Sequence, residues 1–321
     1  MRRIKKEAIE KKLKELAKDY RIFAPMNGDV KETGGEFEEC FPRLSGKCAF
    51  LPPEEEILRY KDGKVEETPE DKPIILFGIR PCDARAISLI ELAMRDEKFP
   101  DVYFLRKKEK GIIISIACKE PGDTCFCTSF GHGPFSTQGS DALLVEKDDY
   151  YLVLGNEKFF KLFGEGEEAR EEDKEYFEEA KKRAEEKIEK IPVDNLGEKL
   201  LSRIEDPVWE KISRKCLNCG ACTFLCPTCY CFDIQDLERS WGVSRRRYWD
   251  SCMFSIYTKE ASGHNPRPTH RERVRNRIMH KFSYYPYLYG EFGCTGCGRC
   301  VVYCPVNFDI REVLKILGGS G

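Results

Sequence analysis

The sequence lacks the features of several classes of protein. It contains no run of about 18 apolar residues, which excludes a typical membrane-spanning helix. Its first 16 residues are charged throughout and do not form the apolar core of a signal peptide, so we expect a cytoplasmic protein. The net charge is only −2, from 54 basic and 56 acidic residues, which predicts no general attraction to nucleic acid or to a membrane surface. With 321 residues, the chain is long enough for about two globular domains.

Cysteine, in contrast, is abundant, with 17 residues in the chain. A secreted disulfide scaffold does not explain this number, because such scaffolds are short and because an odd number of cysteines cannot pair fully within one chain. In a reducing compartment, clustered cysteines indicate metal ligands instead. The abundance of lysine and glutamate also suggests a thermophilic source.

Eight of the cysteines form two runs with the same spacing, C-x2-C-x2-C-x3-C-P. The first run occupies residues 216–227 and the second begins 78 residues later, at residues 294–305. Cysteines at every third position hold one face of a 4Fe–4S cluster in a tight loop, and in two-cluster ferredoxins the fourth cysteine of each run ligates the other cluster. We therefore predict two 4Fe–4S clusters. The expected ligands are Cys216, Cys219, Cys222 and Cys304 for the first cluster, and Cys294, Cys297, Cys300 and Cys226 for the second.

Zinc and free thiols are the alternative explanations for these runs. Structural zinc sites normally use two separated pairs of cysteines, so two runs of four that end in Cys-Pro favour iron–sulfur clusters. Neither run leaves an obvious open iron position. Two adjacent clusters with complete ligand sets indicate electron transfer. One of the two could instead have a purely structural role.

The segment between the two runs is basic, because residues 239–281 carry eleven Lys or Arg and only three Asp or Glu. Its arginines could surround the clusters, dock an acidic partner or bind nucleic acid. We favour the first two roles and expect no nucleic acid, because the chain has no recognisable nucleic-acid-binding motif. Three more cysteines in this half are either small buried residues beside the clusters or include a substitute or extra ligand: Cys229, Cys231 and Cys252.

The first half of the chain has the pattern of an α/β domain. Compact apolar runs at 74–79 and 111–117 predict buried strands, and the segment 83–94 between them predicts a helix. Alternating segments at 141–145 and 150–154 predict a β-hairpin. A short helix is also expected after Pro52 and Pro53, and a charged helix with a narrow apolar seam within 165–190.

The first half also contains a candidate third metal site. Cys82 follows the first predicted strand, and Cys118 follows the second. If these strands are parallel neighbours, both thiols lie at the same edge of the sheet, where Cys125 and Cys127 can fold back over them. A third 4Fe–4S cluster, ordinary cysteines, zinc and a redox disulfide all remain open, because the Cys-Phe-Cys spacing is awkward for a single tetrahedral ion.

We therefore predict three parts of the chain. Residues 1–163 form an α/β domain with the candidate metal site, and residues 164–205 form a charged helical linker. Residues 206–321 form an α+β, mainly helical, ferredoxin-like domain that holds the two clusters and the basic insert.

The sequence resembles the iron–sulfur β subunit of soluble archaeal and bacterial hydrogenases (sulfhydrogenases), and it equally resembles the corresponding iron–sulfur subunit of anaerobic sulfite reductase. The stretches GIRPCD, CKEPGDTCFCTSFG and GSDALLVEK carry the resemblance in the first half. In the second half it rests on CLNCGACTFLCPTCYCFD, RRRYWDSC, GHNPRPTHRERVRNRIMHKF and CTGCGRCVVYCPV.

The resemblance implies an iron–sulfur subunit of an anaerobic, cytoplasmic oxidoreductase complex. A flavin subunit would handle NAD(P)H, and separate catalytic subunits would hold nickel–iron or, in sulfite reductase, sirohaem. The resemblance implies cluster ligation by the eight cysteines of the two runs, and a metal-site role for Cys82, Cys118, Cys125 and Cys127 of the first half. The chain has no G-x-G-x-x-G after a strand and no paired C-x-x-C ligands for nickel–iron, so we expect a non-catalytic electron-transfer subunit. Other classes are an iron–sulfur sensor and a free-standing enzyme that acts near Cys82.

Overall fold

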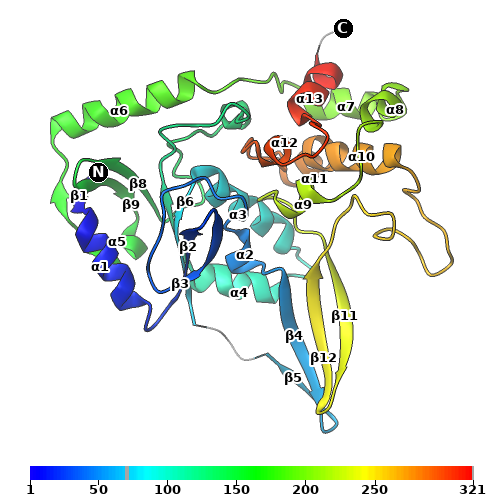
Figure 1. Ribbon diagram of the computed structural model, residues 1–321, viewed down its shortest axis with the longest axis horizontal. Helices are drawn as coiled ribbons and strands as arrows, with labels where there is room; N and C mark the ends of the chain where they lie inside the picture. The colour runs from blue at the N-terminus through cyan, green and yellow to red at the C-terminus, as the bar shows by residue number, and fades with distance from the viewer. Residues whose placement is uncertain (69–71, 320–321) are drawn as a thin grey trace. The chain divides into compact units, whose positions relative to one another are not determined.

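The computed structural model describes residues 1–68 and 72–319, and its contacts divide the chain into two units (Figure 1). The first unit contains Met1–Leu51, Asp71–Lys190 and Thr295–Cys297, and the second contains Pro52–Glu70, Ile191–Cys294 and Gly298–Gly321. This division differs from the boundaries placed at 163 and 205 from the sequence. Residues 164–190, which the sequence placed in the linker, belong to the first unit. The segment Pro52–Glu70, which the sequence placed in the first domain, belongs to the second unit.

The first unit is built on an eight-stranded mixed sheet, in the order β10-β1-β9-β8-β7-β6-β2-β3. The central strands β2, β6, β7 and β8 are parallel, and the others pair antiparallel. Strands β6 and β7 are buried along their whole length, which explains their continuous apolar sequence. The strand bounds are Arg2–Lys5 (β1), Arg21–Met26 (β2), Asp29–Thr33 (β3), Ile74–Ile79 (β6), Ile112–Ile116 (β7), Ala142–Lys147 (β8), Tyr150–Gly155 (β9) and Glu167–Glu168 (β10).

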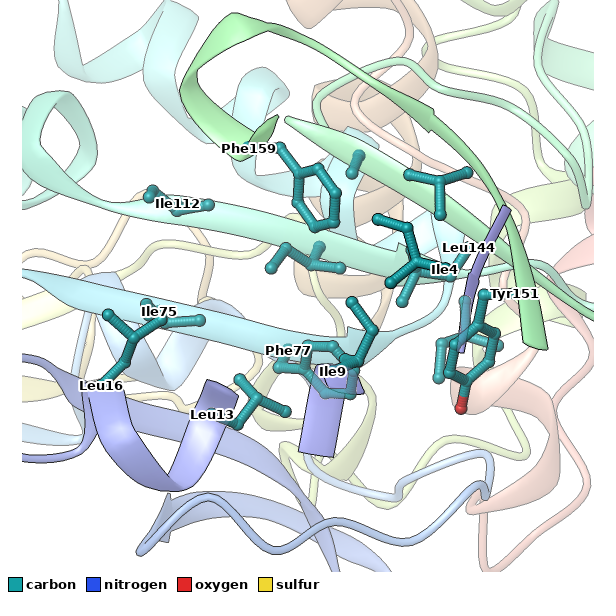
Figure 2. Packing of buried hydrophobic residues seen from close by; sticks show 14 of the residues in the cluster. Ile4, Ile9, Leu13, Leu16, Ile75, Phe77, Ile112, Leu144, Tyr151 and Phe159 are labelled. Carbon is teal, nitrogen blue, oxygen red and sulfur yellow. The ribbon is translucent and has the colours of Figure 1, made fainter. Parts of the chain in front are cut away.

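Helices cover this sheet and complete its hydrophobic core. On one face, Ile9, Leu13 and Leu16 of α1 pack with Phe159 of α5 against apolar side chains of the strands (Figure 2). A second cluster joins Ala180 and Ala184 of α6 to side chains of β8 and β9. The first half is therefore rich in sheet, with helices packed against it. The helix bounds are Lys6–Leu16 (α1), Lys47–Phe50 (α2), Pro81–Met94 (α3), Val102–Lys110 (α4), Glu157–Phe163 (α5) and Glu171–Glu186 (α6).

A buried carboxylate joins α6 to the sheet. The side chain of Asp173 is fully buried and accepts hydrogen bonds from Lys147 Nζ (2.8 Å) and Tyr150 Oη (2.7 Å). The backbone N–H of Arg170 donates a third bond (3.0 Å). Burial acts to raise the pKa of Asp173, but the bonds from Lys147 and Tyr150 outweigh it and lower the pKa to about 2.

We expect Asp173→Asn to destabilise the protein by about 2 kcal/mol at neutral pH, because the lowered pKa is a stability contribution of that size. The pKa of the folded state lies below that of the unfolded state, so this contribution is complete above about pH 4 and is lost as the pH falls toward about 2. Denaturant unfolding between pH 2 and 7 measures both effects. The exposed Glu179 of the same helix supplies the control variant Glu179→Gln. A loss in Asp173→Asn no larger than in this control would contradict the assignment.

The second unit contains more strand than expected from the sequence. Four antiparallel strands form a separate ribbon in the order β11-β12-β4-β5 (Figure 1). The expectation of a helix after Pro53 is wrong, since this segment is strand β4. The strand bounds are Glu54–Lys61 (β4), Lys64–Glu67 (β5), Phe232–Arg239 (β11) and Gly242–Trp249 (β12).

Opposite charges explain why β4 pairs with the basic strand β12. Arg246 Nε lies 2.8 Å from Glu54 Oε1, and Arg247 forms a buried ion pair with Glu55. On the other side, Arg245 pairs with a carboxylate of β11 at 2.7 Å. Opposite-charge cross-strand pairs stabilise a ribbon. Three arginines of the basic insert thus pair with carboxylates in the ribbon.

The remainder of the second unit is formed by short helices and loops that carry the cysteine runs. Helix α9 contains the third cysteine of the first run, and α12 contains the third cysteine of the second. No helix among residues 1–68 and 72–319 combines the length and apolar character needed to cross a membrane. The helix bounds are Leu196–Ser202 (α7), Val208–Ser213 (α8), Ala221–Phe224 (α9), His270–Met279 (α10), Tyr285–Tyr289 (α11), Arg299–Val302 (α12) and Ile310–Gly318 (α13), with a π-helical segment at His280–Tyr284.

Candidate iron–sulfur sites

The four predicted ligands of the first cluster line one cavity of the second unit. This cavity includes about 550 Å³ of space outside protein atoms, counting the part open to solvent. Cys300 of the second run lines it as well. The predicted ligands that share the cavity are Cys216, Cys219, Cys222 and Cys304.

The loop of the first run requires a glycine to turn into α9. Gly220 directly follows Cys219 and has a φ of +77°, a region that side chains with a Cβ rarely adopt. The second run repeats the arrangement, with Gly298 at a φ of +75° before α12. The glycine that follows the second cysteine of each run thus allows the loop to turn into the short helix that follows.

The environment of the cavity suits thiolates bound to metal. Burial raises the pKa of the Cys216 and Cys222 thiols, so metal binding has to displace their protons. Arg277 lines the same cavity and is buried. Burial acts to lower the pKa of this guanidinium, but the surrounding thiols, Cys222 first among them, raise it, and the side chain stays charged.

The remaining walls of this cavity are mainly apolar. They include Met253, Val274, Ile278, Phe308 and Ile310, whereas Cys219 is exposed. Soft sulfur donors in a largely apolar cavity are the donor set that iron–sulfur clusters use. The residues present therefore fit the group that the spacing predicts.

The ligands predicted for the second cluster fall in both units. Cys226, Cys294 and Cys300 belong to the second unit, whereas Cys297 belongs to the first. Cys226 is buried, and Lys281 Nζ lies 3.4 Å from its sulfur. A hydrogen bond with the Cys229 thiol and the positive charge of Lys281 hold the pKa of Cys226 below its ordinary value, despite burial. The shared ligation of one cluster by these four thiols stays a prediction.

Four of the six cysteines of the first half, the candidate metal ligands, line one cavity in the first unit. Cys82 lies in the first turn of α3 after β6, and Cys118 follows β7, so the parallel strands bring both to one edge of the sheet. Burial raises the pKa of Cys118 and raises that of Cys127 to about 12. The predicted thiols that share this cavity are Cys82, Cys118, Cys125 and Cys127.

Cys297 lines this first-unit cavity as well, which the sequence did not indicate. The backbone N–H of Phe126 donates a hydrogen bond to Gly296 O at 2.8 Å, and Cys125 Sγ lies 3.9 Å from Cys297 O. Spacing along the chain carries no signal for such a contact, because about 170 residues separate the two segments. Five thiols thus surround one cavity of the first unit.

Gly296 is a position where close packing excludes any side chain. Its φ is +61°, and an added Cβ would lie 2.5 Å from the backbone nitrogen of Cys127. We expect Gly296→Ala to destabilise the protein by at least about 2 kcal/mol, from the left-handed backbone and from the clash with a rigid main chain. Thermal unfolding tests this, with Gly122→Ala as the control because its added Cβ meets nothing within 4 Å. Equal melting temperatures for the two variants would contradict the expectation.

The thiol groups do not have the geometry of single-ion sites. Among the described residues, no three side chains of His, Cys, Asp or Glu converge on a position that would hold one metal ion. In an iron–sulfur cluster, by contrast, each thiolate binds its own iron atom. Separated thiols around one cavity are therefore compatible with a cluster.

Comparison with known proteins gives a consistent result. A family model described as a 4Fe–4S dicluster domain matches residues 215–308. Over 278 residues, the chain is 33% identical to sulfhydrogenase 2 subunit beta of Pyrococcus furiosus, an alignment that covers 84% of this chain and 82% of the relative. No solved structure matches the chain. The chain therefore carries a 4Fe–4S dicluster domain at residues 215–308 and belongs to the family of iron–sulfur β subunits of sulfhydrogenases.

Proposed function

We propose that this chain relays electrons inside a cytoplasmic, anaerobic hydrogenase-type complex. Its partners would be a flavin subunit that handles NAD(P)H and catalytic subunits that contain nickel–iron. The observation that carries the proposal is the 4Fe–4S dicluster domain at residues 215–308, in a chain that is 33% identical to a sulfhydrogenase β subunit. That relative favours the hydrogenase type over the equivalent subunit of an anaerobic sulfite reductase.

The proposed ligands are those expected from the spacing. When bound, each 4Fe–4S cluster supplies a centre that exchanges one electron. Cys216, Cys219, Cys222 and Cys304 would hold the first cluster, and Cys294, Cys297, Cys300 and Cys226 would hold the second. We also propose that the cavity of the first unit holds a third cluster, with ligands Cys82, Cys118, Cys125 and Cys127.

The chain's own residues would adjust these centres for electron transfer. The apolar side chains Met253, Val274 and Phe308 would make the surroundings of the first cluster less polar. The buried charges of Arg277 and Lys281 favour the more negative, reduced form of nearby thiolate-bound groups, which raises their reduction potential. A non-catalytic role is supported by the sequence, which has no dinucleotide-binding glycine motif.

Removal of the chain from its complex tests the proposal. The complex without this chain should keep hydrogen-dependent reduction of an artificial dye at the catalytic subunits, and it should lose hydrogen-dependent reduction of NAD(P)+. Adding the purified, iron-loaded chain should restore the second activity. Undiminished NAD(P)+ reduction without the chain would show that electrons take another route.

A further inference from the structure

Two thiols of the second unit that neither predicted cluster uses lie side by side. Cys231 directly precedes β11, and Cys252 lies three residues after β12. The pairing of Phe232 with Trp249 brings these two ends of the strand pair together, and Asp250 N donates a hydrogen bond to Cys231 O at 2.9 Å. The ribbon therefore brings together two cysteines that are 21 residues apart in the sequence.

The loop that carries Cys252 is held in place by the residue before it. Ser251 is fully buried, and its hydroxyl is hydrogen-bonded to Thr223 Oγ1 at 2.7 Å. The same hydroxyl accepts a hydrogen bond from Met253 N at 3.1 Å. The position of Cys252 beside Cys231 is thus set by hydrogen bonds of the ribbon and of this loop.

Several hydrogen bonds converge on the sulfur of Cys231. Its donors are the thiol of Cys252, the hydroxyl of Tyr257 and the backbone N–H of Cys252. These bonds, the one from the Cys252 thiol first among them, lower the pKa of Cys231 to about 6 despite burial. The bond with Cys231, together with burial, raises the pKa of Cys252. At neutral pH, Cys231 is therefore the thiolate of the pair and Cys252 holds the proton.

Both thiols line one cavity of the second unit. This cavity includes about 370 Å³ of space outside protein atoms, counting the part open to solvent, and Tyr230 and His280 form part of its wall. Cys231 is half-buried, whereas Cys252 is 9% exposed. A reagent that enters from solvent therefore has better access to Cys231, the more nucleophilic of the two sulfurs.

We propose that Cys231 and Cys252 form a redox-active dithiol that exchanges with small organic disulfides. The Cys231 thiolate attacks one sulfur of the disulfide, forms a mixed disulfide and displaces the first thiolate of the reagent. Cys252 then releases its proton to solvent and attacks the Cys231 sulfur, which closes the Cys231–Cys252 disulfide and displaces the second thiolate. The small disulfide thereby accepts the two electrons that the cysteine pair loses. The proposal is independent of the electron-transfer function.

Anaerobic treatment of the reduced, iron-loaded full chain with hydroxyethyl disulfide tests this reaction. We expect release of about two molecules of mercaptoethanol per chain and a link between Cys231 and Cys252 in mass spectrometry without reductant. The iron content should stay unchanged, and dithiothreitol should reverse the link. Absence of the link, or a link that forms only after the chain has lost iron, would overturn the proposal.

Two variants test the separate roles of the two thiols. Cys252→Ser cannot close the disulfide, so a mixed disulfide should accumulate at Cys231 with release of about one mercaptoethanol per chain. Cys231→Ser should form neither the link nor a mixed disulfide at Cys252, which is buried and protonated. Cys48→Ala is the control that should react like the parent, because Cys48 is buried and lies outside this cavity. A mixed disulfide that forms as fast at Cys252 in Cys231→Ser would overturn the assignment of Cys231 as the attacking thiol.

Cys229 is the other thiol that could close a disulfide with Cys231. It lines the same cavity, but its side chain is hydrogen-bonded to Cys226, a predicted ligand of the second cluster. The variant Cys252→Ser distinguishes the two partners. If Cys229 is the partner, this variant still releases about two mercaptoethanol molecules and accumulates no mixed disulfide, and the proposal fails.

Discussion

Replacing Cys222 by serine is expected to remove about four iron atoms per chain and to abolish electron transfer through the complex. Cys222 lies in the largely apolar cavity that all four predicted ligands of the first cluster line. Serine lacks the soft thiolate that iron–sulfur clusters require. Hydrogen-dependent reduction of NAD(P)+ should fall to the level of the complex without this chain, whereas dye reduction at the catalytic subunits should remain.

Iron analysis and the two activities are measured on the assembled complex. The control is Cys48→Ala, which should keep all iron and both activities, because Cys48 is buried and lines neither predicted cluster cavity. If Cys222→Ser kept parent-level NAD(P)+ reduction after losing its iron, the first cluster would lie outside the electron path.

Changing Cys125 to serine is expected to have the second largest effect, a loss of about four iron atoms from the first unit. Cys125 lines the cavity that it shares with Cys82, Cys118 and Cys127. The walls of this cavity are apolar apart from the thiols and Arg80, so a bound cluster would be shielded from water. The coupled signals of the two clusters in the dicluster domain should persist in electron paramagnetic resonance of the reduced variant.

The same measurement decides between the remaining explanations of this cavity. Unchanged iron and loss of about one zinc in Cys125→Ser would assign a zinc site. Unchanged iron and unchanged zinc would return the four cysteines to a structural role. Either outcome would remove the first unit from the proposed relay.

The cavity of the first unit was predictable from the sequence because its position follows from local patterns. The apolar runs at Ile74–Ile79 and Ile112–Ile116 are long enough only for buried strands, and each is followed by a cysteine after a short interval. Parallel neighbours then bring Cys82 and Cys118 to the same edge of the sheet. Local sequence and sheet geometry were sufficient here.

Strand β4 was not predictable, because its partner is distant in the sequence. The segment Glu54–Lys61 is rich in glutamate, and two prolines precede it, which favours a helix locally. Pairing with β12, almost 200 residues later, overrides this preference through ion pairs such as Arg246 with Glu54. In such cases tertiary contacts override the local preference for a helix.

The packing of Cys297 was missed for a similar reason. Its spacing within the second run predicts a ligand, but spacing does not show that Gly296 accepts a hydrogen bond from Phe126. The grouping of Cys229, Cys231 and Cys252 likewise depends on the β11–β12 pairing, which no local pattern had indicated. Contacts between distant segments thus define the parts of these sites that the sequence left open.

The most direct test of the relay is the redox state of this chain inside the assembled complex. The complex is incubated with hydrogen, frozen and examined by electron paramagnetic resonance, and then NAD(P)+ is added before a second spectrum. We predict that signals of reduced 4Fe–4S clusters from this chain develop under hydrogen, are lost on addition of NAD(P)+, and are altered in Cys222→Ser. Clusters of this chain that stay oxidised under hydrogen, while the catalytic subunits reduce a dye at full rate, would contradict the account.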